Sequence, residues 1–297
     1  MARKRPGDSS KKGPRPKRQG KAPLPVKRKK QKTPLPRVES KQEKEAPATG
    51  PPPRLRGRER INKILSAAGV ASRRRADELM AEGRVSLNGV VIKGPGAAAV
   101  WGKDSIEVDG EEIPAPSHRV YLMLNKPFGY ISALHDPRGR PVISDLVSGL
   151  GERVYPVGRL DFDSLGLLLL TNDGEWAFRM THPKYRVPRT YKITAEGEIS
   201  EIALSRLRSG LELDDGPSGP ARVTALKRDQ GRSVLRITVY QGRSRIVRRM
   251  MEAVGHPVIQ LIRIGFGPLA LGRLKVGEYR HLSQEEIRRA ARIVGLA

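Results

Sequence analysis

Half of the net charge of this chain lies in its first sixth. The chain has 297 residues and a formal net charge of +26, and its first 50 residues hold 17 Lys and Arg against four acidic residues. The same segment contains eight prolines and no aromatic residue. It therefore cannot bury enough apolar surface to offset the entropy lost on ordering. We expect residues 1–57 to form a disordered basic tail, with the folded part beginning at residue 58.

The excess of positive charge indicates an anionic partner, for which nucleic acid and an anionic membrane surface are the usual candidates. The longest apolar run, 165–170, is far shorter than the roughly 18 residues of a membrane-spanning helix. No apolar stretch follows the basic N-terminus, as it would in a secretory signal. Cysteine is absent, which excludes disulfides, Cys-ligated zinc and a thiol nucleophile. We therefore expect a cytoplasmic protein that does not bind membranes.

Two interpretations of the basic tail remain open. It is either an arm that binds RNA through counterion release without sequence preference, or a solubilising extension without a specific partner.

A small module is predicted over residues 58–117. Apolar residues at 61, 64, 65 and 68 recur with helical spacing and are followed by Gly69. Ser72 is typical of the N-cap of a second helix, which ends near Gly83. Two hairpins are expected after it, because each of two strand-like segments contains a hairpin turn sequence, Asn88-Gly89 and Asp109-Gly110.

Three arginines begin the second predicted helix: Arg73, Arg74 and Arg75. Cations in a first helical turn oppose the helix dipole, so they favour a docked phosphate over the alternative of a solvated charge run. The surrounding segment, 59–89, reads ERINKILSAAGVASRRRADELMAEGRVSLNG and resembles the S4 RNA-binding domain. The resemblance implies that the second helix and the following loop face RNA, with these three arginines and Arg84 as contacts.

A candidate catalytic carboxylate lies in residues 153–180, which read RVYPVGRLDFDSLGLLLLTNDGEWAFRM. The apolar run 167–170 predicts a buried strand that leads into a tight turn at 172–174. Asp161 precedes this strand, and a nearby arginine, Arg159, would keep a carboxylate there ionised. That is what a nucleophilic aspartate requires. From the residues alone, a turn aspartate that caps local amides is the alternative.

A second candidate segment, 241–257, reads QGRSRIVRRMMEAVGHP. Apolar residues at 247, 250 and 254 predict one face of a helix, and the other face is cationic, with Arg245, Arg248 and Arg249. Such a face is usually solvated, but in a basic protein it also suits RNA phosphates.

Four ordered motifs combine over the larger part of the chain: NKPFGY, GRLD-x-x-S-x-GLLLLTNDG, RTYKI at 189–193 and GR-x-R-x-VRRM. Together they resemble the RsuA/RluB family of ribosomal RNA pseudouridine synthases over about residues 58–290, the S4-like module included. The segments DPRGRP at 136–141 and LELDDGPSGPA at 211–221 are closest to the RluB branch, which modifies large-subunit ribosomal RNA. The resemblance implies an α+β fold, in which a small S4-like helix-turn-helix and hairpin module precedes a mixed, mainly antiparallel sheet domain at 118–297.

The same resemblance implies roles for individual residues. Asp161 would be the nucleophile, with Arg159 beside it in the turn. Tyr191 would stack beneath the uracil, and Arg248 would pair with Asp161. The expected RNA contacts of this domain are Lys126, Arg243 and Arg245. Ile246 departs from the family pattern, which usually has a polar residue at that position, so one polar contact of the family is not carried over.

The implied reaction breaks the N1–C1′ bond of a uridine, turns the base and joins C5 to C1′, without net redox chemistry or hydrolysis. We therefore expect no metal and no organic cofactor, and the chain has neither a Walker loop nor histidines with metal-ligand spacing. The expected partner is ribosomal RNA or a ribosomal subunit intermediate, and the expected state is a monomer.

Two alternatives remain. A non-catalytic, RNA-binding ribosome-assembly protein would explain the charge and the S4-like module, but it would not require Asp161, Tyr191 and Arg248 together. A glycosidase would use Asp161 and Asp163 as paired carboxylates, and bound carbohydrate in place of RNA would support it.

Overall fold

The computed structural model describes residues 57–113, 118–229 and 231–296. The predicted basic tail, except for residue 57, lies outside the described residues, and so does the segment 114–117 that joins the two predicted domains. The expected disorder of the tail therefore stays a prediction. Among the described residues, no helix is both long enough and apolar enough to cross a membrane.

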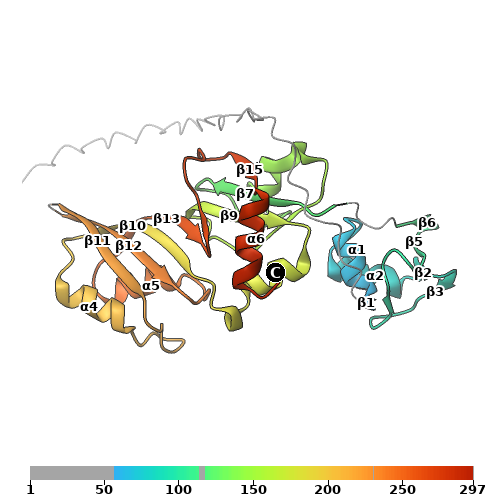
Figure 1. The fold of residues 1–297 in the computed structure, drawn as a ribbon, viewed down its shortest axis with the longest axis horizontal. Helices are drawn as coiled ribbons and strands as arrows, with labels where there is room; N and C mark the ends of the chain where they lie inside the picture. Colours follow the sequence, from blue (N-terminus) through green and yellow to red (C-terminus); the bar gives the residue numbers. More distant parts are fainter. Residues whose placement is uncertain (1–56, 114–117, 230, 297) are drawn as a thin grey trace, which may run out of the picture. The chain divides into compact units, whose positions relative to one another are not determined.

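The N-terminal module contains the two helices and the two hairpins that the sequence predicts (Figure 1). Ser72 caps the second helix, because its hydroxyl accepts a hydrogen bond from the backbone N–H of Arg75 at 3.2 Å. The hairpin residues Asn88 and Asp109 adopt positive φ angles of 50° and 55°, as such turns require. The elements are β1 (Glu59–Arg60), α1 (Ile61–Ala67), α2 (Arg73–Ala81), β2 (Val85–Leu87), β3 (Val90–Val91), β4 (Ala98–Ala99), β5 (Ile106–Val108) and β6 (Glu111–Glu112).

The larger domain is built on a nine-stranded sheet with the strand order β11-β12-β10-β13-β9-β7-β15, to which β8 and β14 pair at β9 and β13. All pairings are antiparallel except the one between β9 and β13. The predicted mixed, mainly antiparallel sheet is thus confirmed. Its strands are β7 (Tyr121–Lys126), β8 (Tyr155–Pro156), β9 (Leu165–Thr171), β10 (Arg189–Glu196), β11 (Arg222–Asp229), β12 (Arg232–Val239), β13 (Val258–Phe266), β14 (Leu269–Ala270) and β15 (Tyr279–His281).

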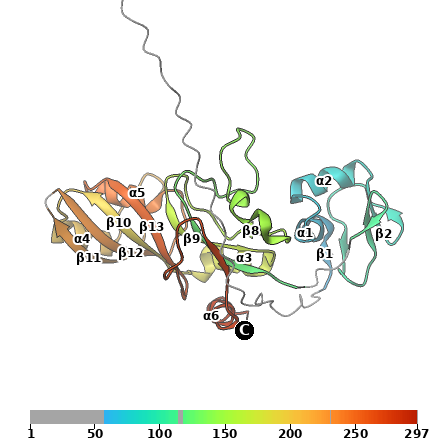
Figure 2. The same cartoon turned by 90° about the horizontal axis from the view of Figure 1, so that it is seen from above.

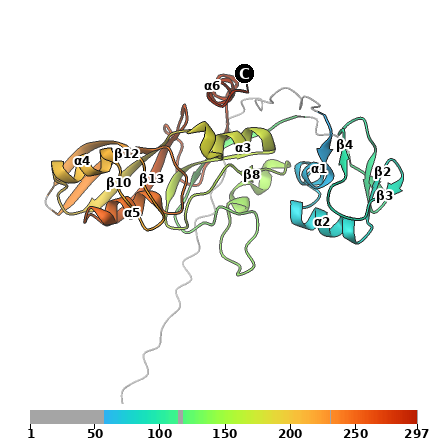
Figure 3. The same cartoon turned by 90° about the horizontal axis from the view of Figure 1, so that it is seen from below.

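Helices cover both faces of this sheet because its central strands are apolar on both sides. Alternate residues of β9 enter two separate cores: Leu168 and Leu170 belong to the core that includes residues of α4 and α5, whereas Leu167 and Leu169 belong to the core that includes residues of α3 and α6. Figures 2 and 3 show α5 and α6 on opposite sides of the sheet. The helices are η1 (Ile143–Leu150), α3 (Gly174–Thr181), η2 (Pro183–Tyr185), α4 (Glu201–Ser209), α5 (Ile246–Ala253) and α6 (Gln284–Ile293).

The tight turn expected at 172–174 is the start of a helix. The Asp173 carboxylate accepts hydrogen bonds from the backbone N–H groups of Glu175 and Trp176, both at 3.1 Å, and so caps α3. It also accepts a hydrogen bond from the Tyr121 hydroxyl at 2.7 Å. Asp173 therefore fixes the exit of β9, while the entry of β9 carries the candidate catalytic residue.

Candidate active site

Asp161 lies in a turn just before β9, and neighbouring segments hold the backbone of this turn. The Ser164 N–H donates to the Asp161 carbonyl at 3.1 Å, which closes the turn. The Ser132 hydroxyl accepts from the Leu160 N–H at 3.0 Å and donates to the Leu160 carbonyl at 2.8 Å. Asp161 itself is half-buried. Its carboxylate therefore stands on a rigid support at the surface of the domain, as a positioned reactive group requires.

Lys126 supports the turn from inside. Its ammonium is fully buried and donates to the Pro127 carbonyl at 3.0 Å and the Ser164 carbonyl at 2.9 Å. Burial lowers the pKa of Lys126 to about 8, against the opposing effect of the nearby Asp161 and Asp163 carboxylates. A side chain without exposed surface does not reach RNA from solvent. The structure therefore contradicts the predicted RNA contact of Lys126 and gives this residue a supporting position beside Asp161.

Arg263 on β13 is a second buried cation at the turn, and the sequence analysis missed it. Its Nε donates to the Leu167 carbonyl at 2.7 Å, and one terminal nitrogen donates to the Arg159 carbonyl at 3.4 Å. The residue is 2% exposed, and its guanidinium lies 5.1 Å from the centre of the Phe266 ring. The only available signal was an arginine within the otherwise apolar strand sequence VIQLIRIGF.

Arg248 occupies a different position from the one predicted. Its guanidinium contacts the Asp163 carboxylate at 3.2 Å and donates to the Asp163 carbonyl at 3.0 Å. In the part of the chain that the structure describes, Arg248 thus pairs with Asp163, and the expected pair with Asp161 is not formed. Arg248 is also buried, so the predicted cationic face of this helix is not a continuous solvated surface.

Arg245 also contacts the Asp163 carboxylate, and it does so from the solvent side. Its guanidinium contacts the two carboxylate oxygens at 3.1 and 3.3 Å, and its side chain is 45% exposed. Arg245 has a φ of 49° and precedes α5, so it is not on the helix. Burial raises the pKa of Asp163, but the hydrogen bond from Arg245 and the charges of Arg248 and Arg245 hold that pKa below its usual value.

Tyr191 and Arg159 are each connected to the Asp161 turn through the backbone. Arg159 is exposed, two residues before Asp161. Tyr191 is 8% exposed and lies on β10, opposite Arg263 of β13 in the strand register. The strand pairing thus links Tyr191 to the arginine that holds the Asp161 turn.

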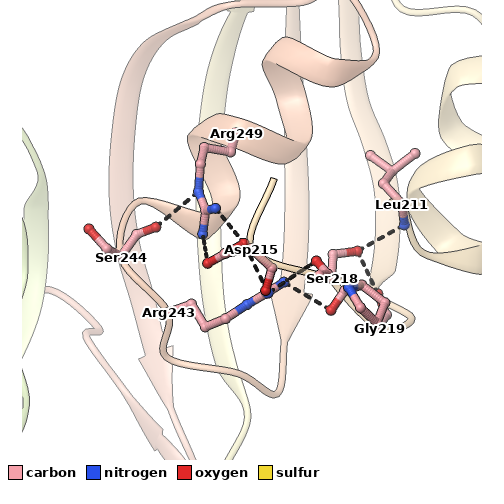
Figure 4. Close-up of polar contacts among 9 residues, drawn as sticks. Leu211, Asp215, Ser218, Gly219, Arg243, Ser244 and Arg249 are labelled. Atoms are coloured by element: carbon pink, nitrogen blue, oxygen red, sulfur yellow. Dashed lines mark hydrogen bonds and ion pairs between the residues drawn. The ribbon is translucent and has the colours of Figure 1, made fainter. Parts of the chain in front are cut away.

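Arg243, predicted as an RNA contact, belongs to a cluster that we call the Asp215 clamp, formed by Asp215, Arg243 and Arg249 (Figure 4). Arg243 contacts the Asp215 carboxylate at 2.9 Å and donates to three backbone carbonyls of residues 215–217. Arg249 contacts both oxygens of the same carboxylate, at 2.6 and 3.0 Å. The hydrogen bond from Arg249 lowers the pKa of Asp215, and the nearby charge of Arg243 adds to this effect. The clamp thus connects the 211–221 loop to α5 and to the residues just before it. Arg243 holds the backbone of this loop through its hydrogen bonds.

The four arginines of the N-terminal module that were predicted as RNA contacts fall into two groups. Arg75 pairs with Glu78 at 2.9 Å and Glu82 at 2.8 Å, and Arg84 pairs with Asp109 at 2.6 Å. These acidic partners raise the pKa of both guanidinium groups. Arg73 and Arg74 are exposed and form no ion pair with any other residue that the structure describes. They are therefore the two of these four arginines whose charge is available to a phosphate.

The described residues contain no cluster of three or more His, Cys, Asp and Glu side chains that could hold a metal ion. The chemistry that this arrangement offers is that of a positioned carboxylate, Asp161, with cationic groups behind it and beside it.

Comparisons with known proteins find relatives of this chain. Residues 120–253 match the family of RNA pseudouridylate synthases, and residues 59–97 match the S4 domain. The chain is 43% identical over 233 residues to the ribosomal large subunit pseudouridine synthase B of Bacillus subtilis, an alignment that covers 78% of this chain and 95% of that protein. It is also 43% identical over 238 residues to an uncharacterised RNA pseudouridine synthase of Aquifex aeolicus, covering 80% of this chain and 95% of that protein.

A solved structure of a pseudouridylate synthase gives a TM-score of 0.56 at 30% identity, covering 78% of this chain and 99% of that chain. Sequence relatives of nearly full length, both family matches and this structure point to one class of enzyme. The chain belongs to the RsuA/RluB family of RNA pseudouridine synthases and carries an S4 domain ahead of its catalytic domain.

Proposed function

We propose that this enzyme converts a specific uridine of large-subunit ribosomal RNA to pseudouridine, with Asp161 as the nucleophile. The observation that carries the proposal is the support of the Asp161 turn. A half-buried carboxylate stands on a backbone held by Ser132 and Lys126, and cationic side chains lie next to it. A nucleophile that must meet one atom of a flipped base needs such a fixed position.

In this mechanism the N1–C1′ bond breaks, the detached uracil turns, and C5 bonds to C1′ while the proton leaves C5 and N1 gains one. The Asp161 carboxylate either adds to C6 of the base, forms an ester at C1′, or assists elimination from the ribose. Each route begins with an ionised carboxylate on one side of the nucleotide. Tyr191, on the strand next to Arg263, stacks beneath the uracil, and Arg159 lies at the exposed edge of the turn.

The substrate class follows from the two domains. A uridine within a helix must leave the stack before its glycosidic bond is reached, and the S4 domain binds the structured RNA around it. Arg73 and Arg74 are the candidate phosphate contacts there, because they are exposed and free of ion pairs with other described residues. The name of the Bacillus subtilis relative supports the large subunit as the source of the RNA. The enzyme acts as a monomer on the RNA or on a subunit assembly intermediate.

The test measures the pseudouridine that the enzyme forms in ribosomal RNA that initially lacks the modification. Large-subunit and small-subunit RNAs, each free and assembled into subunits, are incubated with the enzyme, digested to nucleosides and separated by chromatography. We expect one new pseudouridine in the large-subunit RNA only. Pseudouridine in the small-subunit RNA alone would overturn the proposed substrate, and its absence from all four samples would overturn the proposed activity on ribosomal RNA.

A further inference from the structure

Two phenylalanine rings are exposed next to the candidate nucleophile. Phe128 is 61% exposed and Phe162 is 45% exposed, although the chain contains only four phenylalanines. Their ring centres lie 6.0 Å apart, with an angle of 56° between the ring planes. This spacing is within the range of interacting aromatic pairs. Neither ring is needed to fill the core, and an exposed apolar pair beside a reactive group indicates a ligand.

Both rings stand on the same support as the Asp161 carboxylate. Phe162 follows Asp161 in the chain, and its carbonyl accepts a hydrogen bond from the Gly129 N–H at 2.9 Å. Gly129 follows Phe128, and Lys126 bonds to the Ser164 carbonyl on the other side of the turn. These contacts tie the NKPFG and GRLDFDS segments together. A ligand on the two rings is therefore held in a fixed position relative to Asp161.

The charge around the rings favours a polyanion with aromatic groups over a purely apolar ligand. Arg159 is exposed three residues before Phe162, and Arg245 is exposed and bonded to Asp163, one residue after it. Single-stranded nucleic acid is bound in this manner elsewhere: basic groups contact the phosphates and aromatic rings stack with the bases. Tyr191 is 8% exposed, so it is less accessible than these two rings.

We propose that Phe128 and Phe162 form an aromatic ledge that stacks with an unpaired base next to the target uridine. The inference rests on the proposed function and adds to it a contact for the neighbouring nucleotide. Flipping the uridine removes its stacking on that neighbour, and the ledge replaces part of this stacking. Because every base has a flat apolar face, the ledge accepts any base and selects for an unpaired one.

The kinetic test compares ring removal at the ledge with ring removal elsewhere. The double variant F128L/F162L keeps apolar side chains but removes both rings, and F178L is the matched control. Phe178 on α3 is 52% exposed, and its ring packs against His182 at 4.8 Å. With ribosomal RNA as substrate, we expect kcat/KM of the double variant to fall on the order of tenfold through KM, as for loss of one stacked base. We expect F178L to match the wild type.

Tryptophan at both positions restores a stacking surface, so F128W/F162W is expected to retain most of the wild-type kcat/KM. A double leucine variant with wild-type kcat/KM would overturn the ledge. An equal loss in F178L would also overturn it, because the effect would then not depend on the position of the ring.

A binding test separates failure of the ledge from failure of the proposed function. Full-length enzyme is titrated into a single-stranded RNA that contains one 2-aminopurine, whose fluorescence falls when it stacks on an aromatic ring. We expect quenching by wild type, D161N and F178L, and much weaker quenching by F128L/F162L. If no ribosomal RNA is modified but this pattern of quenching holds, the proposed function fails and the ledge stands. Equal quenching by all variants would overturn the ledge.

Discussion

Single residues show how the site gathers positive charge behind one carboxylate. Lys126, Arg248 and Arg263 lie far apart in the sequence, are no more than 6% exposed, and all contact residues 159–167. Buried cations are unfavourable unless they are well partnered. Here backbone carbonyls and the Asp163 carboxylate are the partners. The backbone around Asp161 is therefore held by three buried cations, and one of them, Lys126, lies near enough to the Asp161 carboxylate for their charges to interact.

The buried ammonium of Lys126 predicts a specific dependence of stability on pH. Its pKa is about 8 in the folded protein, against about 10.4 in an unfolded chain. Between these values the unfolded state binds more protons at this site, so the contribution of Lys126 to the free energy of unfolding rises with pH. We expect Lys126→Met to remove this rise. Chemical denaturation at several pH values measures it.

The control for this experiment is Lys192→Met, at an exposed position of β10. In that variant the free energy of unfolding should still rise between about pH 8 and 10.4 because of Lys126. Identical pH profiles for the wild type and Lys126→Met would contradict a lowered pKa of the buried ammonium.

At the scale of elements, the sequence predicts most of the framework because local signals determine it. Ser72 and the turns at Asn88 and Asp109 appear where their local chemistry places them, and the apolar run 167–170 is a buried strand. The partners of Arg248 and Lys126 could not be predicted in this way. Their positions depend on the pairing of β7, β9 and β13, which brings distant residues together. The cationic pattern of the helix could not reveal that Arg248 points into the protein.

Gly166 lies in the parallel pairing of β9 with β13, where the backbones leave no room for a side chain. It has a φ of 102°, and a Cβ atom there would overlap the backbone carbonyl oxygen of Arg263 on β13. Gly166→Ala should therefore push apart the short parallel pairing of β9 and β13. We expect it to lower the free energy of unfolding by about 2 kcal/mol or more, as measured by chemical denaturation.

Gly149→Ala is the matched control, because Gly149 does not have a positive φ and a Cβ there would meet no atom within 4 Å. This variant should be as stable as the wild type. A Gly166→Ala protein of wild-type stability would show that the β9–β13 contact is looser than the structure indicates.

The Asp215 clamp predicts the behaviour of the 211–221 loop. Asp215→Ala removes the acceptor that Arg243 and Arg249 share, so the loop should detach from the start of α5. We expect faster amide hydrogen exchange in residues 211–221 and faster proteolysis there. Asp214→Ala is the control, since the neighbouring exposed carboxylate has no ion pair among the described residues. Equal exchange in both variants would argue against the clamp.

At the scale of the whole molecule, positive charge is divided between the basic tail and the folded domains. The tail holds 17 of the 57 Lys and Arg in its first 50 residues. The folded domains hold positive charge at fixed positions, among them the exposed arginines at 73, 74, 159 and 245. We expect the tail to add affinity for RNA without selecting a site, because counterion release does not depend on base sequence.

Deletion of residues 1–56 tests this division. For single-stranded RNA, the slope of log K against log salt should become less negative by about 0.7 for each phosphate that the tail neutralises in the full-length protein, while kcat stays the same. Filter binding at several salt concentrations measures the slope. An unchanged slope would identify the tail as a solubilising extension.

In the proposed mechanism, Asp161 performs the chemistry and Asp163 positions Arg245 and Arg248 beside it. The most direct measurement is tritium release from ribosomal RNA labelled at uridine C5, with wild type, D161N and D163N compared side by side. We expect release by the wild type, reduced release by D163N, and none by D161N, whose RNA affinity should equal that of the wild type. Release by D161N at the wild-type rate would contradict the assignment of the nucleophile.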